Sequence, residues 1–285
     1  MKRRDFLISA AAASAVMLMP PAFAAPTRFT SDRISVVVQG SGPDVILIPG
    51  LTASREMWQG TVAAVAGYRY HLVQVAGFAG APAGGNARGP VVQPVAAEIA
   101  RYIDVAGLRA PSLIGHSMGG TLAMMIAARH PSKVGRVMVV DMLPAPAGLL
   151  GASAEGIRPL ADALAGVLTS SPGGRRLLES LIGGFGASDG AAQSDSDVVA
   201  TAMHELALID LSAELPRITA PMTLVYATPP AGSGVDPAQV TRDYRQGYRA
   251  APNAKLVAVA NSGHMIMYDQ PQRFRAEVKA FLSGR

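Results

Sequence analysis

Two pieces of the sequence, far apart along the chain, carry residue types that can perform nucleophilic chemistry together. Gly115-His116-Ser117-Met118-Gly119 matches the pattern G-x-S-x-G, in which a serine sits on a sharp turn between a strand and a helix. The glycines around Ser117 let backbone segments approach closely, and the strained turn lifts the hydroxyl clear of its strand. Near the C-terminus, Ser262-Gly263-His264 supplies an imidazole that can take the proton of such a hydroxyl.

The elements that must position these pieces predict a mostly parallel sheet. An apolar run at 112–115 leads into the Ser117 motif, and an alanine-rich stretch at 121–129 follows it. Further apolar runs alternate with stretches of helical spacing, which is typical of an α/β fold with helices on both faces of the sheet. We predict strands at 34–38, 44–48, 70–75, 112–115, 137–140, 222–227 and 256–260, and helices at 55–66, 91–106, 121–129, 237–250 and 274–282.

From about residue 143 to about residue 211 the pattern changes, and glycine, alanine and serine dominate. Amphipathic pieces at 161–169 and 198–208 predict helices there. We interpret this stretch, 143–211, as a helical cap insertion that lies over the sheet.

Beyond its N-terminal segment, the chain resembles the α/β-hydrolase superfamily nearly end to end. Three pieces carry the resemblance: Ile46-Leu47-Ile48-Pro49-Gly50 as the strand and loop of an oxyanion donor, Gly115 to Gly120 as the nucleophile elbow, and Ser262-Gly263-His264 followed by Asp269-Gln270-Pro271. The resemblance implies an α/β-hydrolase domain over 25–285, with Ser117 as nucleophile and His264 as general base. Many members have His-Gly where this chain has Pro49-Gly50, which removes a bracing side chain but leaves the backbone donor.

Chain order favours His264 as the base, because it lies in a turn just after the last predicted strand, where the family carries this residue. A serine hydroxyl is a poor nucleophile until such a base takes its proton. The other histidines are weaker candidates, since they lie at a strand start, inside the elbow, at a helix end and in the insertion: His71, His116, His130 and His204.

Two aspartates are candidates for the carboxylate that fixes the tautomer of the base. Asp141 directly ends the strand after the elbow helix, and the carboxyl end of a parallel strand faces the crevice where such sheets bind ligands. Asp236 precedes His264 by 28 positions, a spacing common in the family. However, a long loop separates Asp236 from its strand, and Pro237 behind it suits a helix N-terminus. We favour Asp141 and keep Asp236 as the alternative acid.

The resemblance also implies two backbone donors for an oxyanion hole. One is the N–H of Met118, the residue after the nucleophile, and the other is the N–H of Leu51, in the loop after the 44–48 strand. Met265 and Met267, beside the base, are the best candidates for the wall of a substrate pocket, although apolar residues more often belong to the plain core.

Composition excludes several other kinds of site. The 285 residues include no cysteine, which rules out a thiolate nucleophile, a disulfide and a Cys-ligated metal. The formal net charge of +5 is spread thinly, unlike the clustered basic face of a nucleic-acid-binding protein. No Gly-x-Gly-x-x-Gly follows the first strands, so a dinucleotide site is unsupported. We predict no cofactor, no metal and no nucleic-acid partner, and the sequence leaves the oligomeric state open.

The first residues have the layout of a signal peptide. Arg3-Arg4-Asp5-Phe6-Leu7 resembles the twin-arginine type, an apolar run follows from Ile8 to Met19, and Ala22-Phe23-Ala24 offers small residues to a signal peptidase. The apolar run is shorter than the roughly 20 residues that span a bilayer. We predict that residues 1–24 are removed on export and that the product is periplasmic or secreted, with no stable membrane span.

These features predict a serine hydrolase that cleaves a small-molecule ester, of small or medium size, through an acyl-enzyme intermediate. The same residues also serve amide, lactone or carbon–carbon bond hydrolysis and cofactor-free haloperoxidation, and fold does not decide among these. A non-catalytic binding protein on the same scaffold is a weaker alternative, because Ser117 and His264 are both present.

Overall fold

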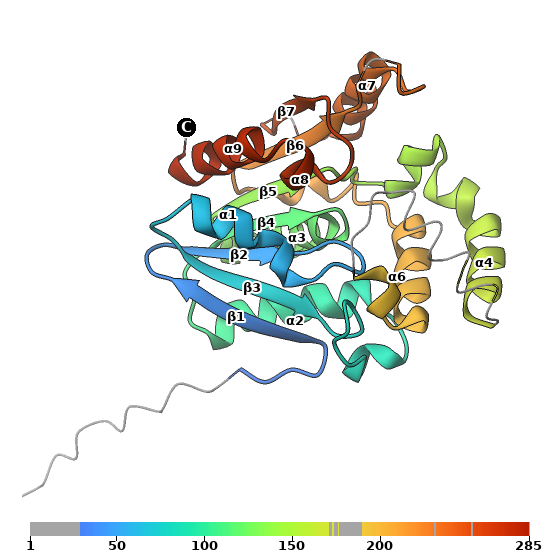
Figure 1. Ribbon diagram of the computed structural model, residues 1–285, viewed down its shortest axis with the longest axis horizontal. Helices are drawn as coiled ribbons and strands as arrows, with labels where there is room; N and C mark the ends of the chain where they lie inside the picture. The colour runs from blue at the N-terminus through green and yellow to red at the C-terminus, as the bar shows by residue number, and fades with distance from the viewer. Residues whose placement is uncertain are drawn as a thin grey trace, which may run out of the picture.

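A seven-stranded sheet forms the centre of the molecule, with strand order β1-β3-β2-β4-β5-β6-β7 (Figure 1). The computed structural model describes residues 29–170, 173, 176, 190–230, 232–251 and 253–284, so the predicted signal peptide at 1–24 lies outside the described residues. The strands are β1 (Ile34–Gly40), β2 (Asp44–Ile48), β3 (Arg69–Val75), β4 (Ser112–His116), β5 (Arg136–Val140), β6 (Met222–Thr228) and β7 (Lys255–Ala260).

Parallel pairing dominates the sheet. Only β1 runs antiparallel to its neighbour, β3, and the other five neighbouring pairs are parallel. The carboxyl ends of β2 to β7 therefore meet at one edge, which is the edge where open α/β sheets bind ligands. The predicted fold class, a mostly parallel central sheet flanked by helices, is confirmed.

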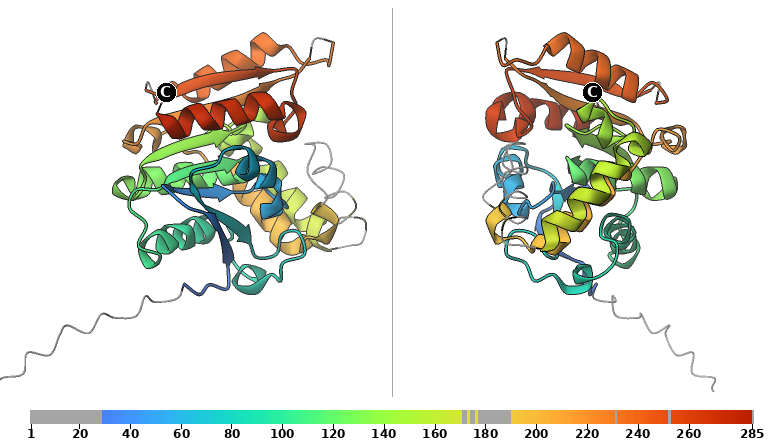
Figure 2. Two further views of the ribbon diagram at one scale, coloured as in Figure 1. Left: turned by 60° about the vertical axis from the view of Figure 1, so that its left-hand side comes forward. Right: turned by 90° about the vertical axis from the view of Figure 1, so that its right-hand side faces the viewer.

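Helices cover both faces of the sheet (Figures 1 and 2). Residues of α1, α8 and α9 pack in one apolar cluster, and residues of α2, α3 and α7 pack in the other. The bounds are α1 (Gln59–Ala64), α2 (Val92–Val105), α3 (Met118–Arg129), α4 (Ala154–Ser170), α6 (Ser196–Leu208), α7 (Pro237–Gly247), α8 (Ile266–Asp269) and α9 (Pro271–Ser283). Short 3-10 turns occur at Arg55–Trp58, Gly84–Ala87, Pro131–Lys133, Pro146–Leu150, Ala191–Gln193 and Leu215–Arg217.

Strand β2 shows why the buried parallel strands appear in the sequence as continuous apolar runs, without alternating polar residues. Val45 and Leu47 belong to the cluster under α1 and α9, whereas Ile46 and Ile48 belong to the cluster under α2 and α3. All four side chains are fully buried. A parallel strand covered on both faces needs apolar residues at every position, and each such side chain contributes roughly 1.5–3 kcal/mol by leaving water.

The described part of the predicted insertion is helical and lies between β5 and β6 in the chain. Helices α4 and α6 pack against each other beyond the sheet (Figure 1). Asp195 caps α6 with its side chain, and its backbone N–H donates to Gly77 O at 2.7 Å, so α6 is tied to the loop after β3. The Glu205 carboxylate of α6 accepts from the N–H groups of Val91 and Val92, at 2.9 and 2.7 Å, where α2 begins.

Several elements differ from the sequence-based expectation, among them helix α4, which begins at Ala154, seven residues before the predicted start at 161. Helix α3 begins at Met118, three residues before the predicted start, because Gly119 and Gly120 continue the helix instead of forming a turn. A Cβ on Gly119 would lie 2.2 Å from Ile48 O, so only glycine lets the helix approach β2 this closely. The short helix α8, directly after the His264 loop, was not predicted.

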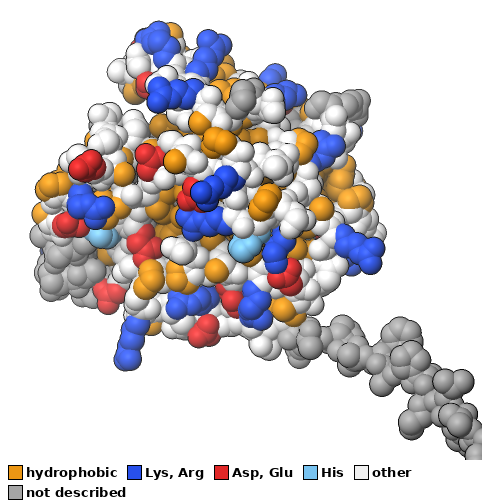
Figure 3. All heavy atoms as spheres, turned by 180° about the vertical axis from the view of Figure 1, so that it is seen from behind, with side chains coloured by type: hydrophobic (Ala, Val, Ile, Leu, Met, Phe, Trp, Pro, Cys, Tyr) orange, Lys and Arg blue, Asp and Glu red, His pale blue; other side chains and the backbone are white. Residues whose placement is uncertain are grey.

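The surface carries charges of both signs. On the face shown in Figure 3, basic and acidic side chains lie among one another. Within the described ranges, no helix combines the length and the apolar character that a membrane crossing requires.

Candidate active site

Ser117 occupies a strained turn at the carboxyl end of β4. Its φ of 52° and ψ of −122° are unusual for a residue with a side chain, and such strain is common at functional sites. The backbone N–H of Ser117 donates to Val140 O at 2.9 Å, which ties the turn to β5. A Cβ on Gly115 would lie 2.0 Å from Gly119 O, so this glycine is required for the chain to fold back so tightly. The predicted elbow is therefore present, with Ser117 at its tip.

The strain recurs along this edge of the sheet. Thr52, Ser117, Asp141 and Asn261 all have φ between 52° and 60°, and they follow β2, β4, β5 and β7 respectively. Non-glycine residues seldom adopt this conformation, and each instance costs on the order of 1–3 kcal/mol. The strained residues thus mark the edge where the candidate site residues lie.

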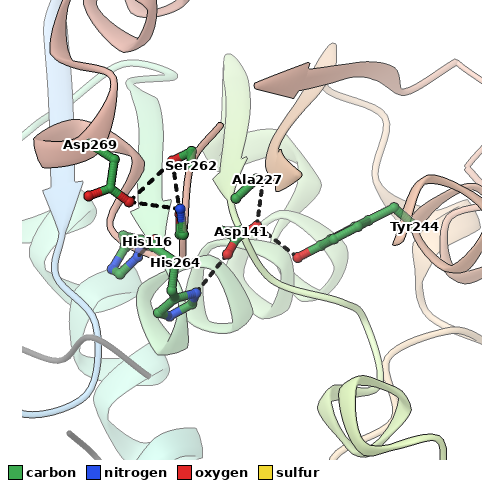
Figure 4. Close-up of polar contacts among 8 residues, drawn as sticks. His116, Asp141, Ala227, Tyr244, Ser262, His264 and Asp269 are labelled. Atoms are coloured by element: carbon green, nitrogen blue, oxygen red, sulfur yellow. Dashed lines mark hydrogen bonds and ion pairs between the residues drawn. The ribbon is translucent and has the colours of Figure 1, made fainter. Parts of the chain in front are cut away.

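The side chain of His264 forms a hydrogen bond with that of Asp141. The two side chains come from the segments after β7 and β5, two strands that flank β6, and His264 Nδ1 lies 2.7 Å from Asp141 Oδ2 (Figure 4). Both side chains are partly buried, with 19% and 10% of their surface exposed. Because Nδ1 faces the carboxylate, Nε2 lies on the opposite edge of the imidazole ring, which is the arrangement a general base needs.

Asp236 does not take part in this contact. It caps the N-terminus of α7, where its carboxylate accepts from Ala238 N–H at 2.9 Å, and it pairs with Arg242 at 3.2 Å. Its side chain is 58% exposed. The hydrogen bond from Ala238 lowers the pKa of this carboxyl, and Arg242 adds to the effect. Of the two candidate acids, the structure brings Asp141 to His264 and leaves Asp236 as a helix cap.

Two donors hold the other oxygen of Asp141. Oδ1 accepts from the backbone N–H of Ala227 at 2.8 Å, in β6, and from the hydroxyl of Tyr244 at 3.0 Å, in α7 (Figure 4). Ala227 belongs to the neighbouring strand, and Tyr244 is almost fully buried. The carboxylate is thus anchored through Oδ1 while Oδ2 faces His264.

His116 links the elbow to the base loop. Its side chain is 2% exposed, its Nε2–H donates to the backbone carbonyl of His264 at 2.9 Å, and the two imidazole centroids lie 4.6 Å apart. Burial, reinforced by the charge of His264, lowers the pKa of His116 to about 3, so this imidazole is neutral at pH 7. Gly50 packs on the other side, where an added Cβ would lie 2.9 Å from His116 Nδ1.

Helix α8 stabilises the loop that carries His264 through its last residue, Asp269. Asp269 Oδ2 accepts from Gly263 N–H at 2.8 Å and from the Ser262 hydroxyl at 3.4 Å (Figure 4). Ser262 N–H in turn donates to Thr228 O at 3.3 Å, at the end of β6. These bonds fix the backbone on the N-terminal side of the base, so His264 is presented from an ordered turn.

The two predicted oxyanion donors lie at the ends of β2 and β4. Met118 is the first residue of α3, where helix N–H groups have no partner inside the helix. Leu51 directly follows Gly50. The backbone of Gly50 packs close to the elbow, because a Cβ added there would lie within 3.2 Å of the side chains of His116 and Ser117. In the described part of the chain, neither N–H donates a backbone hydrogen bond. Both are therefore available to the carbonyl oxygen of an ester whose carbon Ser117 attacks.

The methionines beside the base belong to the core. Met265 and Met267 are 8% and 6% exposed and pack in the apolar cluster with α1 and α9. Within the described ranges, no group of three or more His, Asp or Glu side chains is placed to hold a metal ion.

A family model described as "Alpha/beta hydrolase family" matches residues 45–277. The match covers most of the chain and all the candidate site residues. This chain belongs to the α/β hydrolases.

Several relatives of this α/β hydrolase are esterases. A pimeloyl-[acyl-carrier protein] methyl ester esterase of Aeromonas hydrophila is 32% identical over 112 residues, which is 39% of this chain and 42% of that protein. The match to the Aeromonas protein thus spans less than half of its length. A protein of the same name from Vibrio atlanticus is 25% identical over 270 residues, which is 88% of this chain and 98% of that protein.

A solved esterase from Thermogutta terrifontis has the same fold, with a TM-score of 0.69 and 20% sequence identity over 88% of this chain and 93% of that one. At this identity the likeness concerns the fold alone. The comparisons therefore establish the family and show that some relatives are esterases. The substrate of this hydrolase has to be inferred from the geometry of its own site.

Sequence reasoning missed three residues that the structure places around the pair. His116 was considered only as a weaker candidate for the base, Tyr244 only as part of a helix, and Asp269 only as part of a family match without a role. Their partners are between 6 and 148 positions away in the chain. The position of a histidine directly before the nucleophile is the one local signal in the sequence that could have drawn attention to His116.

Proposed function

We propose that this protein hydrolyses carboxylic esters of small or medium size through an acyl-enzyme on Ser117. The observation that carries the proposal is the His264–Asp141 contact at 2.7 Å, made at the same edge of the sheet as the strained Ser117 turn. The esterase relatives support the same reaction class.

In the first half of the reaction, Ser117 Oγ attacks the ester carbonyl while His264 Nε2 takes the hydroxyl proton. The carbonyl oxygen becomes an oxyanion, which the N–H groups of Met118 and Leu51 stabilise. His264 then gives its proton to the leaving alkoxide, so an alcohol departs and the acyl group stays on Ser117.

In the second half, a water molecule takes the place of the alcohol. His264 Nε2 removes a proton from the water, the resulting hydroxide attacks the acyl carbonyl, and the same two N–H groups hold the second oxyanion. The Ser117–acyl bond breaks, His264 returns the proton to Ser117 Oγ, and a carboxylic acid is released. Throughout, Asp141 keeps Nδ1 of His264 protonated and stabilises the imidazolium.

A fluorophosphonate probe tests the proposal directly, because it phosphonylates an activated serine irrespective of the natural substrate. Wild-type protein should be labelled at Ser117, and Ser117→Ala should abolish both labelling and ester hydrolysis while the chain stays folded. Removing the nucleophile leaves only about 10³–10⁴-fold acceleration over water. Ser112→Ala, at the start of the same strand, is the matched control and should be labelled normally. An unlabelled, folded wild type, or near-normal turnover by Ser117→Ala, contradicts the proposal.

A panel of esters, amides and lactones then defines the bond and the size of the acyl group. We expect the highest kcat/KM on p-nitrophenyl esters with short or medium acyl chains. Faster turnover of amides or lactones would retain the Ser117 mechanism and move the substrate class to one of the alternatives that the fold permits.

We also propose that the enzyme is exported, because residues 1–24 have the twin-arginine layout described above. N-terminal sequencing of periplasmic protein should begin at Ala25. A periplasmic product that still begins at Met1 would contradict this assignment.

A further inference from the structure

The Tyr244 hydroxyl touches Asp141 from an element that the reaction described above does not use. Tyr244 lies in α7, 103 positions from Asp141 in the chain, and its hydroxyl donates to Asp141 Oδ1 at 3.0 Å. Its ring stacks on Tyr226 of β6, with centroids 4.5 Å apart and an interplanar angle of 27°. Burial, reinforced by the charge of Asp141, raises the pKa of this phenol well above its ordinary value, so it keeps its proton and remains a donor.

We propose that Tyr244 is a positioning residue for the proposed ester hydrolysis: its hydroxyl holds Asp141 in the rotamer that faces His264 and disperses part of the carboxylate charge. Asp141 Oδ1 accepts from Tyr244 and from Ala227 N–H, which leaves Oδ2 for His264. A carboxylate with two donors on one oxygen cannot turn without breaking both bonds. The inference rests on the function proposed for Ser117.

Because the Tyr244 hydroxyl disperses the charge of Asp141, its removal should change the pH dependence of kcat/KM in one direction. A hydrogen bond to Asp141 weakens the pull of its charge on the imidazolium of His264. Without that bond the carboxylate attracts the proton on the imidazole more strongly and stabilises the imidazolium form. The acidic limb of kcat/KM, which reports the free base, therefore moves to higher pH when the Tyr244 hydroxyl is removed.

Other groups near the carboxylate must be considered in such a profile. His264 pairs with Asp141, His116 lies against His264 with ring centroids 4.6 Å apart, and Tyr226 stacks on Tyr244. Tyr248, the residue directly after α7, also senses the charge of Asp141, but its hydroxyl donates to Met142 O at 2.7 Å. His116 stays neutral across the working range, since its pKa is about 3.

Tyr248 provides a matched control, because it is also a buried tyrosine of this segment whose hydroxyl donates a hydrogen bond, but to a carbonyl. We expect Tyr244→Phe to lower kcat about tenfold with little change in KM, and to move the acidic limb up by about 0.5–1 pH unit, the size that one hydrogen bond gives. Tyr248→Phe should leave the limb in place. If the two variants have the same pH profile, the proposal is wrong.

Two further measurements separate an effect exerted through Asp141 from a general disturbance of the structure. In the Asp141→Asn background, adding Tyr244→Phe should cost no additional kcat, because the partner carboxylate is gone; an equal cost in both backgrounds would overturn the proposal. Site-specific 3-fluorotyrosine at position 244 keeps the shape and donates more strongly, so the limb should move down. An upward or absent shift also contradicts the inference.

Failure of the inference differs from failure of the proposed function. Titration of the His264 imidazole by NMR reports its pKa without any substrate, and Tyr244→Phe should raise that pKa by the same 0.5–1 unit. A wild type that neither reacts with fluorophosphonate nor hydrolyses esters refutes the function. An active wild type whose His264 pKa is insensitive to Tyr244→Phe refutes only the role of Tyr244.

Discussion

Two aspartate–histidine pairs sit at opposite ends of the same sheet and differ in which ring nitrogen faces the carboxylate. At the carboxyl edge, His264 uses Nδ1 to contact Asp141 Oδ2 at 2.7 Å. Near the amino edge, His71 in β3 uses Nε2 to contact Asp44 Oδ1 at 2.9 Å, at the start of β2. The chemical types are identical, so the surroundings decide what each pair can do.

In the Asp44–His71 pair, both ring nitrogens of the histidine have hydrogen-bond partners within the protein. Tyr102 occupies the second ring nitrogen of His71 with a 2.6 Å hydrogen bond, Arg69 pairs with Asp44, and His71 is only 2% exposed. Burial lowers the pKa of His71 despite the opposing effect of Asp44, so this ring is neutral at pH 7. Both nitrogens are engaged within the protein, which suits a structural role. The Asp141–His264 pair lies instead beside a strained serine, with His264 19% exposed.

The largest expected contrast is in turnover. Asp141→Asn should lower kcat by up to about 10⁴-fold, because an asparagine stabilises the wrong tautomer of His264. Asp44→Asn removes the corresponding charge from the other pair and should leave kcat unchanged while lowering the melting temperature. Steady-state kinetics on purified, folded variants checks both. An equal loss in the two variants would mean that the position of the pair does not matter.

The free energy of unfolding should depend strongly on pH because of His116. The pKa of His116 is about 3 in the folded chain and 6.5 without perturbation, so the unfolded state binds more protons between these values. Stability is therefore complete above about pH 6.5 and is lost as pH falls towards 3, by about 5 kcal/mol in total from this group. Urea unfolding of wild type and His116→Gln across this range should show a flatter profile for the variant. Parallel profiles would contradict the assignment.

At the Asp44–His71 pair, Tyr102→Phe should cost about 1–3 kcal/mol of unfolding free energy. The change leaves Nδ1 of His71 buried without its donor, and an unsatisfied buried group costs this much. Denaturant titration measures the loss, and kcat should stay at the wild-type value. A change in kcat without a change in stability would assign this second pair a functional role.

The smallest effect is expected for Asp236, the candidate acid that does not contact His264. Asp236→Ala removes the side-chain cap of α7 and should lower the free energy of unfolding by about 1 kcal/mol or less. Because Asp236 is remote from the base, kcat/KM should not change. A loss of turnover comparable to that of Asp141→Asn would restore Asp236 as the acid.

Local patterns in the sequence were sufficient for the sheet and for two candidate residues. The central parallel strands read as apolar runs because both of their faces are covered, and the runs at 44–48 and 112–115 match β2 and the core of β4. Ser117 stands out because its turn needs glycines at fixed offsets, and His264 because it follows the last strand. The catalytic roles of both stay predictions until Ser117→Ala is measured.

The choice between Asp141 and Asp236 could not be completed from the sequence. Both aspartates follow strands and precede His264, and the eight residues from 228 to 235 could have folded back towards the site. The three-dimensional arrangement decides the choice: Asp141 lies against His264, whereas Asp236 is the N-cap of α7 that Pro237 had suggested.

What the sequence determined by itself is a parallel α/β sheet with a serine at a strained elbow, since periodicity and glycine spacing are local properties of the chain. The tertiary structure alone decided which acid meets His264, that Tyr244 and Ala227 hold that acid, and that His116 reaches the base loop. These contacts join residues 86 to 148 positions apart. They depend on the order in which the strands are laid side by side, because strand order, rather than sequence distance, brings the ends of β4, β5, β6 and β7 together.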